Sequence, residues 1–395
     1  MASLTLASIV YLLAVREFFS TPTFSRRVVV IGLVLAAVWH VQFLRVPAGA
    51  EDDIHRYVWD GRLQRLGYNP YLVIPSDPAA QLLHTPETRS LNNPDLPSPY
   101  PPGAQMFFRA VTAIQESTFA LKVAFVICEL AIAFVLLDVL RYHRKGAHLV
   151  LVYAWSPLLA IEVAGSGHID IVGALLLLVS AAALSRRWRA TAAVAFGLAV
   201  AVKFLPVVLL PLYWKRIRIR DAALAVAVVG LLYVPFLHHW RIPTGSVGTY
   251  VQSFRFNGPV FAMLDRVAPP QLLAGLAVLV GLVTATWLRR VTPEGSPELF
   301  AWPMAATLLG APAVFPWYLL WLLPFLRAPS ALLMIVWTVS IFPTYIMWHW
   351  RTLGRPWGAL PVWVMLLEYG CVAIAAGIIW LRRRREAGRA GTLSD

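Results

Sequence analysis

The sequence predicts an all-α polytopic membrane protein, and three observations lead to that fold class. Hydrophobic residues make up 59% of the 395 positions and charged residues only 14%. The mean hydropathy of +0.66 lies outside the range of ordinary soluble domains. Apolar stretches long enough to cross a hydrocarbon core about 30 Å thick recur along the chain. Cys128 and Cys371 both lie inside such stretches, so neither a disulfide framework nor a zinc cluster is predicted.

The apolar stretches define the expected helices, since one span needs about twenty apolar residues. We expect the first to be a retained span, because the first twenty residues contain no basic leader and no small-residue cleavage site. Together with one broken hairpin, the pattern predicts about 11 to 13 transmembrane or half-span helices. The expected spans cover residues 2–18, 28–45, 118–140, 147–164, 169–184, 221–238, 270–288, 297–312, 315–327, 331–348 and 359–381.

The hairpin is predicted for residues 190–214, which lie between two basic clusters. A single straight helix would place these clusters on opposite sides of the membrane. We therefore expect the chain to enter over 190–201 and to return over 203–214. Lys203 and two prolines lie where the break would fall, and irregular backbone is tolerated at that depth only where protein or a watery cavity surrounds it.

The basic residues indicate how the chain is oriented. Of the 34 lysines and arginines, 21 lie in short loops and tails beside the spans, which is typical of cytoplasmic loops. The net charge of +14 is thus explained by the membrane, and no nucleic-acid partner is predicted. The basic tail 382–395 would be cytoplasmic, and the amino terminus and the loop 46–117 extracytoplasmic. We expect that loop to form short juxtamembrane surface helices and Pro-rich turns within one membrane domain, 1–395.

The densest ionisable cluster lies at the start of this loop, where Glu51, Asp52 and Asp53 precede His55 and Arg56. Three acids beside a cation at a membrane surface indicate chemistry; the alternative is a solvated run that only keeps the loop out of the cytoplasm. Further polar and aromatic groups are predicted on the same face: Glu162, His168, Asp170, Arg255, Asn257, Trp317 and Tyr318.

Seven short segments occur in a characteristic order and spacing between about residues 50 and 325. They are 53–61 (DIHRYVWDG), 69–71 (NPY), 100–103 (YPPG), 167–170 (GHID), 202–206 (VKFLP), 256–258 (FNG) and 316–321 (PWYLLW). In this order they resemble the bacterial GT-C membrane glycosyltransferases. More narrowly, they are similar to the mannosyltransferases that use polyprenol-phosphate-mannose.

The resemblance implies a GT-C-type fold with its active site at the extracytoplasmic edge of the bacterial plasma membrane. It implies inverting transfer of a sugar, mannose above all, from a polyprenyl-phosphate donor to a lipid or glycan acceptor of the cell envelope. An acid of the first external loop would be the general base, because an attacking hydroxyl must lose its proton to a carboxylate. Asp52 and Asp53 are both candidates, and the family pattern favours Asp53. Tyr57 and Tyr100 would contact substrate, and His55 replaces the family's usual tyrosine.

Lys203 is an ionisable residue in an apolar stretch, a placement that costs several kcal/mol unless something compensates it. The phosphate of a lipid donor would do so, since a cation stabilises the charge that develops on the leaving group. Arg255 and Arg56 could complete an anion clamp. Alternatively, Lys203 snorkels to a headgroup or pairs with Glu129 or Glu162.

His168, Asp170 and Glu162 could hold sugar hydroxyls, although Asp170 could equally cap a helix. Trp317 and Tyr318 could stack on a sugar face or a prenyl chain, or serve as interfacial anchors. The scheme requires no cofactor, and a divalent cation is not excluded by it; imidazole and carboxylate ligands are present, but without a familiar metal-binding spacing.

Two other classes of protein fit parts of the pattern. A multi-span transporter or flippase would also have many spans and a broken hairpin, but no two-half repeat is visible and the acids lie near the surface. A non-catalytic assembly subunit would have lost the acids that this chain retains. The predicted partners are therefore a polyprenyl-phosphate sugar donor, a glycolipid or glycan acceptor and membrane lipids.

Overall fold

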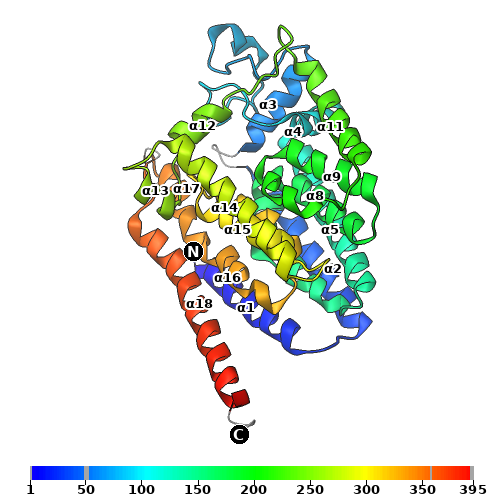
Figure 1. Ribbon diagram of the computed structural model, residues 1–395. Coiled ribbons are helices and arrows are strands. Elements are labelled where there is room, and N and C mark those ends of the chain that lie inside the picture. Colours follow the sequence, from blue (N-terminus) through cyan, green and yellow to red (C-terminus); the bar gives the residue numbers. More distant parts are fainter. Residues whose placement is uncertain (1, 49–52, 356–357, 392–395) are drawn as a thin grey trace.

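The fold consists of helices, as the sequence predicts (Figure 1). The computed structural model describes residues 2–48, 53–355 and 358–391. It is 72% helical, and its described residues form no strand, only two isolated bridges, His238 with Arg241 and Phe256 with Ala313. Asp52 lies outside the described residues.

Seven helices among the described residues are long and apolar enough to cross a membrane. A bent pair, 147–154 with 157–166, forms an eighth candidate with an angle of 48°. The protein is therefore an integral membrane protein. The seven candidates include α1 (Ala2–Ser20), α2 (Arg26–Phe43), α5 (Thr118–Tyr142), α11 with η5 (Ile219–Phe236), α14 (Pro270–Val291), α16 and α17 (Leu332–Ser340, Ile346–Thr352) and the apolar part of α18 (Val362–Gly391).

Two of the expected spans are shorter apolar helices, α8 (Asp170–Ser185) and α15 (Glu298–Leu309). The entering half of the expected hairpin is a third, α9 (Arg189–Val202). The whole circumference of α8 is apolar and most of it is buried, as expected of a helix enclosed by others. The expected span at 315–327 is instead two short 3₁₀ turns, η6 (Pro316–Trp321) and η7 (Leu323–Phe325). Pro316 and Pro324 lack the N–H that a continuous helix needs at these positions.

The hairpin prediction is confirmed. The chain breaks after α9, and Lys203 lies beside Asp170 at the start of α8. Arg216 then pairs with Glu294 at 2.9 Å, and the neighbouring Gly295 lies beside Ser185 at the end of α8. The chain has therefore returned to the end from which α9 began. The returning segment consists of η4 (Leu205–Leu209) and α10 (Leu210–Tyr213).

The two ends of the bundle differ in composition. At one end, here called the basic end, lie the clusters 141–145, 186–189, 215–220 and 289–290. At the other end, here called the site end, lie α3 (Asp53–Arg65), α4 (Pro102–Ile114) and α12 (Val247–Ser253), in the upper part of Figure 1. Helix α18 extends from this half of the molecule down past the rest of the bundle.

The helix α3 is buried, although we expected short surface helices in the loop 46–117. Tyr57 stacks on Phe108 of α4 with ring centroids 4.4 Å apart. Two neighbouring side chains replace water at the buried carboxylate of α3: Oδ2 of Asp60 accepts hydrogen bonds from Ser98 and from Gln105, the latter at 2.9 Å. Because these bonds replace water, the amphipathic segment can lie inside the protein, where its first residue is held in a fixed position.

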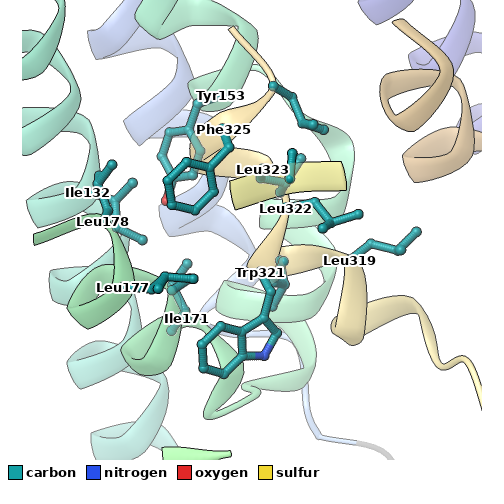
Figure 2. Packing of buried hydrophobic residues seen from close by; sticks show 14 of the residues in the cluster. Ile132, Tyr153, Ile171, Leu177, Leu178, Leu319, Trp321, Leu322, Leu323 and Phe325 are labelled. Carbon is teal, nitrogen blue, oxygen red and sulfur yellow. The ribbon is translucent and has the colours of Figure 1, made fainter. Parts of the chain in front are cut away.

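The packing of Trp321 connects the core to the site end. Figure 2 shows Trp321 of η6 near Ile171 and Leu177 of α8. The ring lies so close to Gly173 that a Cβ at this position would collide with it. This close approach brings the indole N–H within 2.7 Å of Asp170 Oδ1. The missing side chain at Gly173 therefore allows Trp321 to bind the buried carboxylate of Asp170.

Candidate active site

A cavity of about 890 Å³ opens at the site end, within the range of sites that bind small molecules, roughly 300–1,000 Å³. Segments that are far apart in the chain line it: the start of α3, the loop 91–101, the break after α9, α12 and the aromatic segment 315–318. It brings together six residues that the sequence singled out, Asp53, Tyr100, Lys203, Arg255, Trp317 and Tyr318.

Asp53 is the first residue of α3, where an acidic side chain interacts favourably with the helix macrodipole. Its side chain is 16% exposed, and Oδ2 lies 4.0 Å from Nδ1 of His168. The side-chain amide of Asn92 donates a hydrogen bond to Oδ1. The carboxylate is therefore held by a neighbouring side chain and borders the cavity.

His168 is buried beside this carboxylate. Its Nε2 lies 3.0 Å from Oε2 of Glu162, and its ring stacks on Trp317 at 4.0 Å. The Tyr345 hydroxyl donates a hydrogen bond to the other oxygen of Glu162. A π-helical segment, η3 (Ala160–Ser166), precedes the histidine, and such segments often occur at functional sites. Gly167, with φ of 83°, makes the left-handed turn that a residue without a side chain adopts most easily.

Lys203 is held by Asp170. The ammonium lies 2.7 and 3.0 Å from the two carboxylate oxygens and 4.0 Å from the centroid of the Tyr318 ring. Asp170 is fully buried, whereas Lys203 is 23% exposed. The pair therefore presents a cation to the cavity and keeps its counter-ion inside the protein.

Two of the alternatives predicted for Lys203 and Asp170 differ from the contacts in the structure. Glu129, a possible partner of Lys203, pairs with His40 instead. Asp170 is the first residue of α8, and the helix has no side-chain cap at Ile169. The capping interpretation of Asp170 is therefore wrong.

The two arginines that were predicted to bind the donor phosphate differ in position. Arg56 is buried, and its guanidinium donates hydrogen bonds to the carbonyls of Asn92, Asn93 and Leu96 at 2.6–2.9 Å; it does not line the cavity. Arg255 does line it, but its guanidinium binds Asp265 at 2.7 and 3.3 Å and neighbouring backbone carbonyls.

Tyr57 and Asn257 also lie away from the cavity lining. Tyr57 is buried between α3 and α4. The amide of Asn257 donates to Glu368 at 2.8 Å and to the Val314 carbonyl at 3.3 Å. Tyr100 does border the cavity, and burial, followed by the charge of Asp53, raises its pKa well above the usual value. Tyr100 therefore stays protonated at neutral pH.

Sequence reasoning missed Asn92 and Arg351, which both line the cavity. Asn92 lies in a Pro- and Asn-rich loop, where its pattern is typical of a turn. Arg351 follows the aromatic run 348–350, which by itself predicts an interfacial belt. The cationic side chain directly after this aromatic run was the signal that could have identified Arg351 as a site residue. Across the residues that the structure describes, no group of three or more His, Cys, Asp or Glu is arranged to hold a metal ion.

The fold and the site together define a class of protein: an all-helical integral membrane protein in which a carboxylate, cations and aromatic rings share one cavity. A comparison of sequences identifies the family. The family described as "Alpha-(1->6)-mannopyranosyltransferase, N-terminal domain" matches residues 1–217, more than half of the 395 residues. The chain belongs to this family and is a glycosyltransferase of the membrane class that the sequence resembles.

The matched region ends before Arg255, Asn257, Trp317 and Tyr318. It contains the other predicted site residues, which are Asp52, Asp53, Arg56, Tyr57, Tyr100, Glu162, His168, Asp170 and Lys203. No curated protein matches the chain. Among solved structures, the chain is similar to "ArnT from Cupriavidus metallidurans bound to Undecaprenyl phosphate", with 17% sequence identity and a TM-score of 0.48. That alignment covers 91% of this chain and 73% of the other.

Proposed function

We propose that the protein is an inverting glycosyltransferase that moves mannose from a polyprenyl-phosphate donor to a hydroxyl of a lipid or glycan acceptor. One observation carries this proposal: the carboxylate of Asp53 and the ammonium of Lys203 line the same cavity, in a chain of the mannopyranosyltransferase family. A base and an anion-binding cation are the two groups that such a displacement needs.

Asp53 is the proposed general base. The acceptor oxygen attacks the anomeric carbon from the face opposite the phosphate, and its proton passes to Asp53. The bond between this carbon and the phosphate oxygen breaks, and the electron pair leaves with the phosphate. The Asn92 amide holds one oxygen of Asp53, and His168 lies 4.0 Å from the other.

Lys203 is the proposed cation at the leaving group. The donor is a phosphodiester, and the departing polyprenyl phosphate is a monoester that carries more negative charge. A fixed ammonium beside it stabilises this charge as it develops. Asp170 and Tyr318 orient the ammonium. Arg255 could assist only by exchanging Asp265 for the phosphate, and Arg56 instead fixes the loop that carries Asn92.

The rest of the cavity supports binding of a sugar and a prenyl chain. Trp317, Tyr318 and Trp348 line it, and aromatic rings offer apolar faces to both ligands. His168 stacks on Trp317 and lies beside Glu162, and Asp170 binds Lys203. These three residues would position the rings or a sugar hydroxyl. The scheme needs no metal, so transfer is expected to continue in the presence of a chelator.

The membrane orientation is part of the same proposal. Lysines and arginines gather at the basic end, which would be cytoplasmic by the positive-inside rule. The active site would then be extracytoplasmic, and the tail after α18 cytoplasmic. This orientation is tested by cysteine labelling in intact cells. Single cysteines are introduced into the loop 53–117 and into the loop 186–189.

The experiment that tests the reaction uses purified protein in lipid nanodiscs, a panel of radiolabelled polyprenyl-phosphate sugars and a membrane lipid extract. Wild type is compared with Asp53→Asn and Asp52→Asn. We expect transfer from the mannose donor that is lost in Asp53→Asn and retained in Asp52→Asn. If transfer is lost only in Asp52→Asn, Asp52 is the general base. Neither binding nor transfer with any donor would overturn the proposal in favour of a transporter.

A further inference from the structure

A second cavity lies at the basic end, far from the proposed reaction. It has a volume of about 620 Å³. The ends of α1 and α5, the segment 294–298 before α15 and the turn 327–329 before α16 line it. No residue of the candidate active site contributes to it, so its function must be derived from its own lining.

Cations from two separate segments surround this cavity. Arg144 and Lys145 follow the end of α5, and Arg327 lies between η7 and α16. The backbone of the first two is fixed, since the Lys145 N–H donates to the Leu140 carbonyl at 2.8 Å in the pattern of a helix C-cap. Burial lowers the pKa of Arg327 to about 10, against an opposing effect of Glu298, so its guanidinium remains charged at neutral pH.

Positive charges also act on the histidine that lines this cavity. The pKa of His143 is lowered, first by burial and then by the charges of Arg327, Arg186 and Lys145. Two acids also line the cavity, but both have partners. Glu294 pairs with Arg216 at 2.9 Å, and Glu298 accepts a hydrogen bond from Ser330. Arg144 and Lys145 are exposed and can turn toward a ligand.

The remaining wall of the cavity is apolar. It includes Phe18, Phe19, Leu140 and Leu149, at the ends of helices that are long and apolar enough to span the membrane. A free inorganic anion would gain nothing from this wall, whereas a lipid would place its headgroup among the cations and its glycerol and first methylenes against the rings. Basic pockets between membrane helices commonly bind anionic headgroups in this way.

We propose that this cavity binds the phosphate headgroup of an anionic phospholipid, on the side of the membrane opposite the active site, with Arg144, Lys145 and Arg327 as its cationic ligands. The proposal does not depend on the reaction at the site end. Since each cation near a membrane surface contributes about 1 kcal/mol to the binding of an anionic lipid, removal of two lowers the affinity by about thirtyfold.

The test uses the full-length protein in neutral detergent, and its thermal midpoint is measured while phosphatidylglycerol, phosphatidylcholine or inorganic phosphate is added. Native mass spectrometry counts the bound lipid. The test variant is Arg144→Gln/Lys145→Gln, and Arg327→Gln is the second. The matched control is Arg26→Gln/Arg27→Gln, which removes two exposed charges that do not line the cavity.

We expect phosphatidylglycerol alone to raise the midpoint and to remain bound as one molecule. Half-saturation should shift by about thirtyfold in the test double variant and less than twofold in the control. Equal loss in both double variants would mean general surface attraction and would overturn the site. An equal effect of inorganic phosphate would identify a free anion as the ligand, and an absent effect of phosphatidylglycerol would reject the proposal. The exposed double variant keeps the test valid if Arg327→Gln does not fold.

Discussion

The site end and the basic end of the molecule both concentrate charge, but they hold it in different ways. At the site end the ion pair of Lys203 and Asp170 has one fully buried partner and further contacts to Trp321 and Tyr318. At the basic end Arg186 pairs with an aspartate whose side chain is 65% exposed, and Arg216 with a glutamate that is 76% exposed.

This difference shows what each set of charges can do. A buried pair is fixed by packing, so its charge has a defined direction, which an active site needs. An exposed pair is weak and screened by salt, and is sufficient for membrane orientation and for lipids. The predictions below test this contrast, from the largest expected effect to the smallest.

The largest effect is expected from Asp53→Asn. It keeps the shape of the side chain and removes the base, so the rate of transfer should fall by about 10²–10⁴-fold while donor binding is retained. Initial rates with labelled donor and a separate donor-binding assay measure the two quantities. Asp77→Asn is the control, because Asp77 caps η1 in the same loop and does not line the cavity. A similar fall in both variants would contradict the proposed role.

The next effect concerns stability. Lys203→Met leaves the carboxylate of Asp170 buried without its cation, which costs about 3–5 kcal/mol when a buried pair is broken. Arg186→Gln breaks an exposed pair and should cost less than about 1 kcal/mol. Thermal midpoints in one detergent compare the two variants. If they destabilise the protein equally, the two ends do not differ in the way that their burial indicates.

A third prediction uses pH. Burial, opposed by the charge of Arg56 and by hydrogen bonds from Ser98 and Gln105, raises the pKa of Asp60 from 3.8 to about 6. The folded protein then holds this proton more tightly than the unfolded chain, so unfolding releases it between about pH 4 and 6. Stability should therefore decrease as the pH rises through this window, by up to about 3 kcal/mol. In Asp60→Asn the stability should no longer decrease between about pH 4 and 6. If the stability of both proteins varied with pH in the same way, Asp60 would not be the group that titrates.

The sequence predicted much of the fold because hydrophobicity and charge are local signals. The spans were visible as long apolar stretches, and the break at Lys203 as a charge within such a stretch. The acidic start of α3 was visible as a local concentration of acids. The family comparison supports the same class of enzyme. The roles of the individual site residues stay predictions.

The pairings could not be predicted, because they depend on distances between segments far apart in the chain. Asp170 lies 33 positions before Lys203, and nothing local distinguishes it from Glu129 or Glu162 as a partner. Arg56 had the appearance of a phosphate ligand, since a sequence does not reveal that three carbonyls already bind its guanidinium.

The smallest effect is expected from Gly173→Ala. The added Cβ would collide with the Trp321 ring, and relief of such overpacking typically costs about 1–3 kcal/mol. Moving the ring also weakens the hydrogen bond from its indole N–H to Asp170, so the activity with the mannose donor should fall as well. Thermal midpoint and initial rate are both measured.

Gly230→Ala is the matched control for this substitution. Its Cβ would enter open space in α11, so stability should stay unchanged or rise by up to about 1 kcal/mol, with full activity. If Gly173→Ala behaved like this control, the packing of Trp321 on Gly173 would not set the geometry of the Asp170 and Lys203 pair. The difference between the two ends of the molecule would then depend on burial alone.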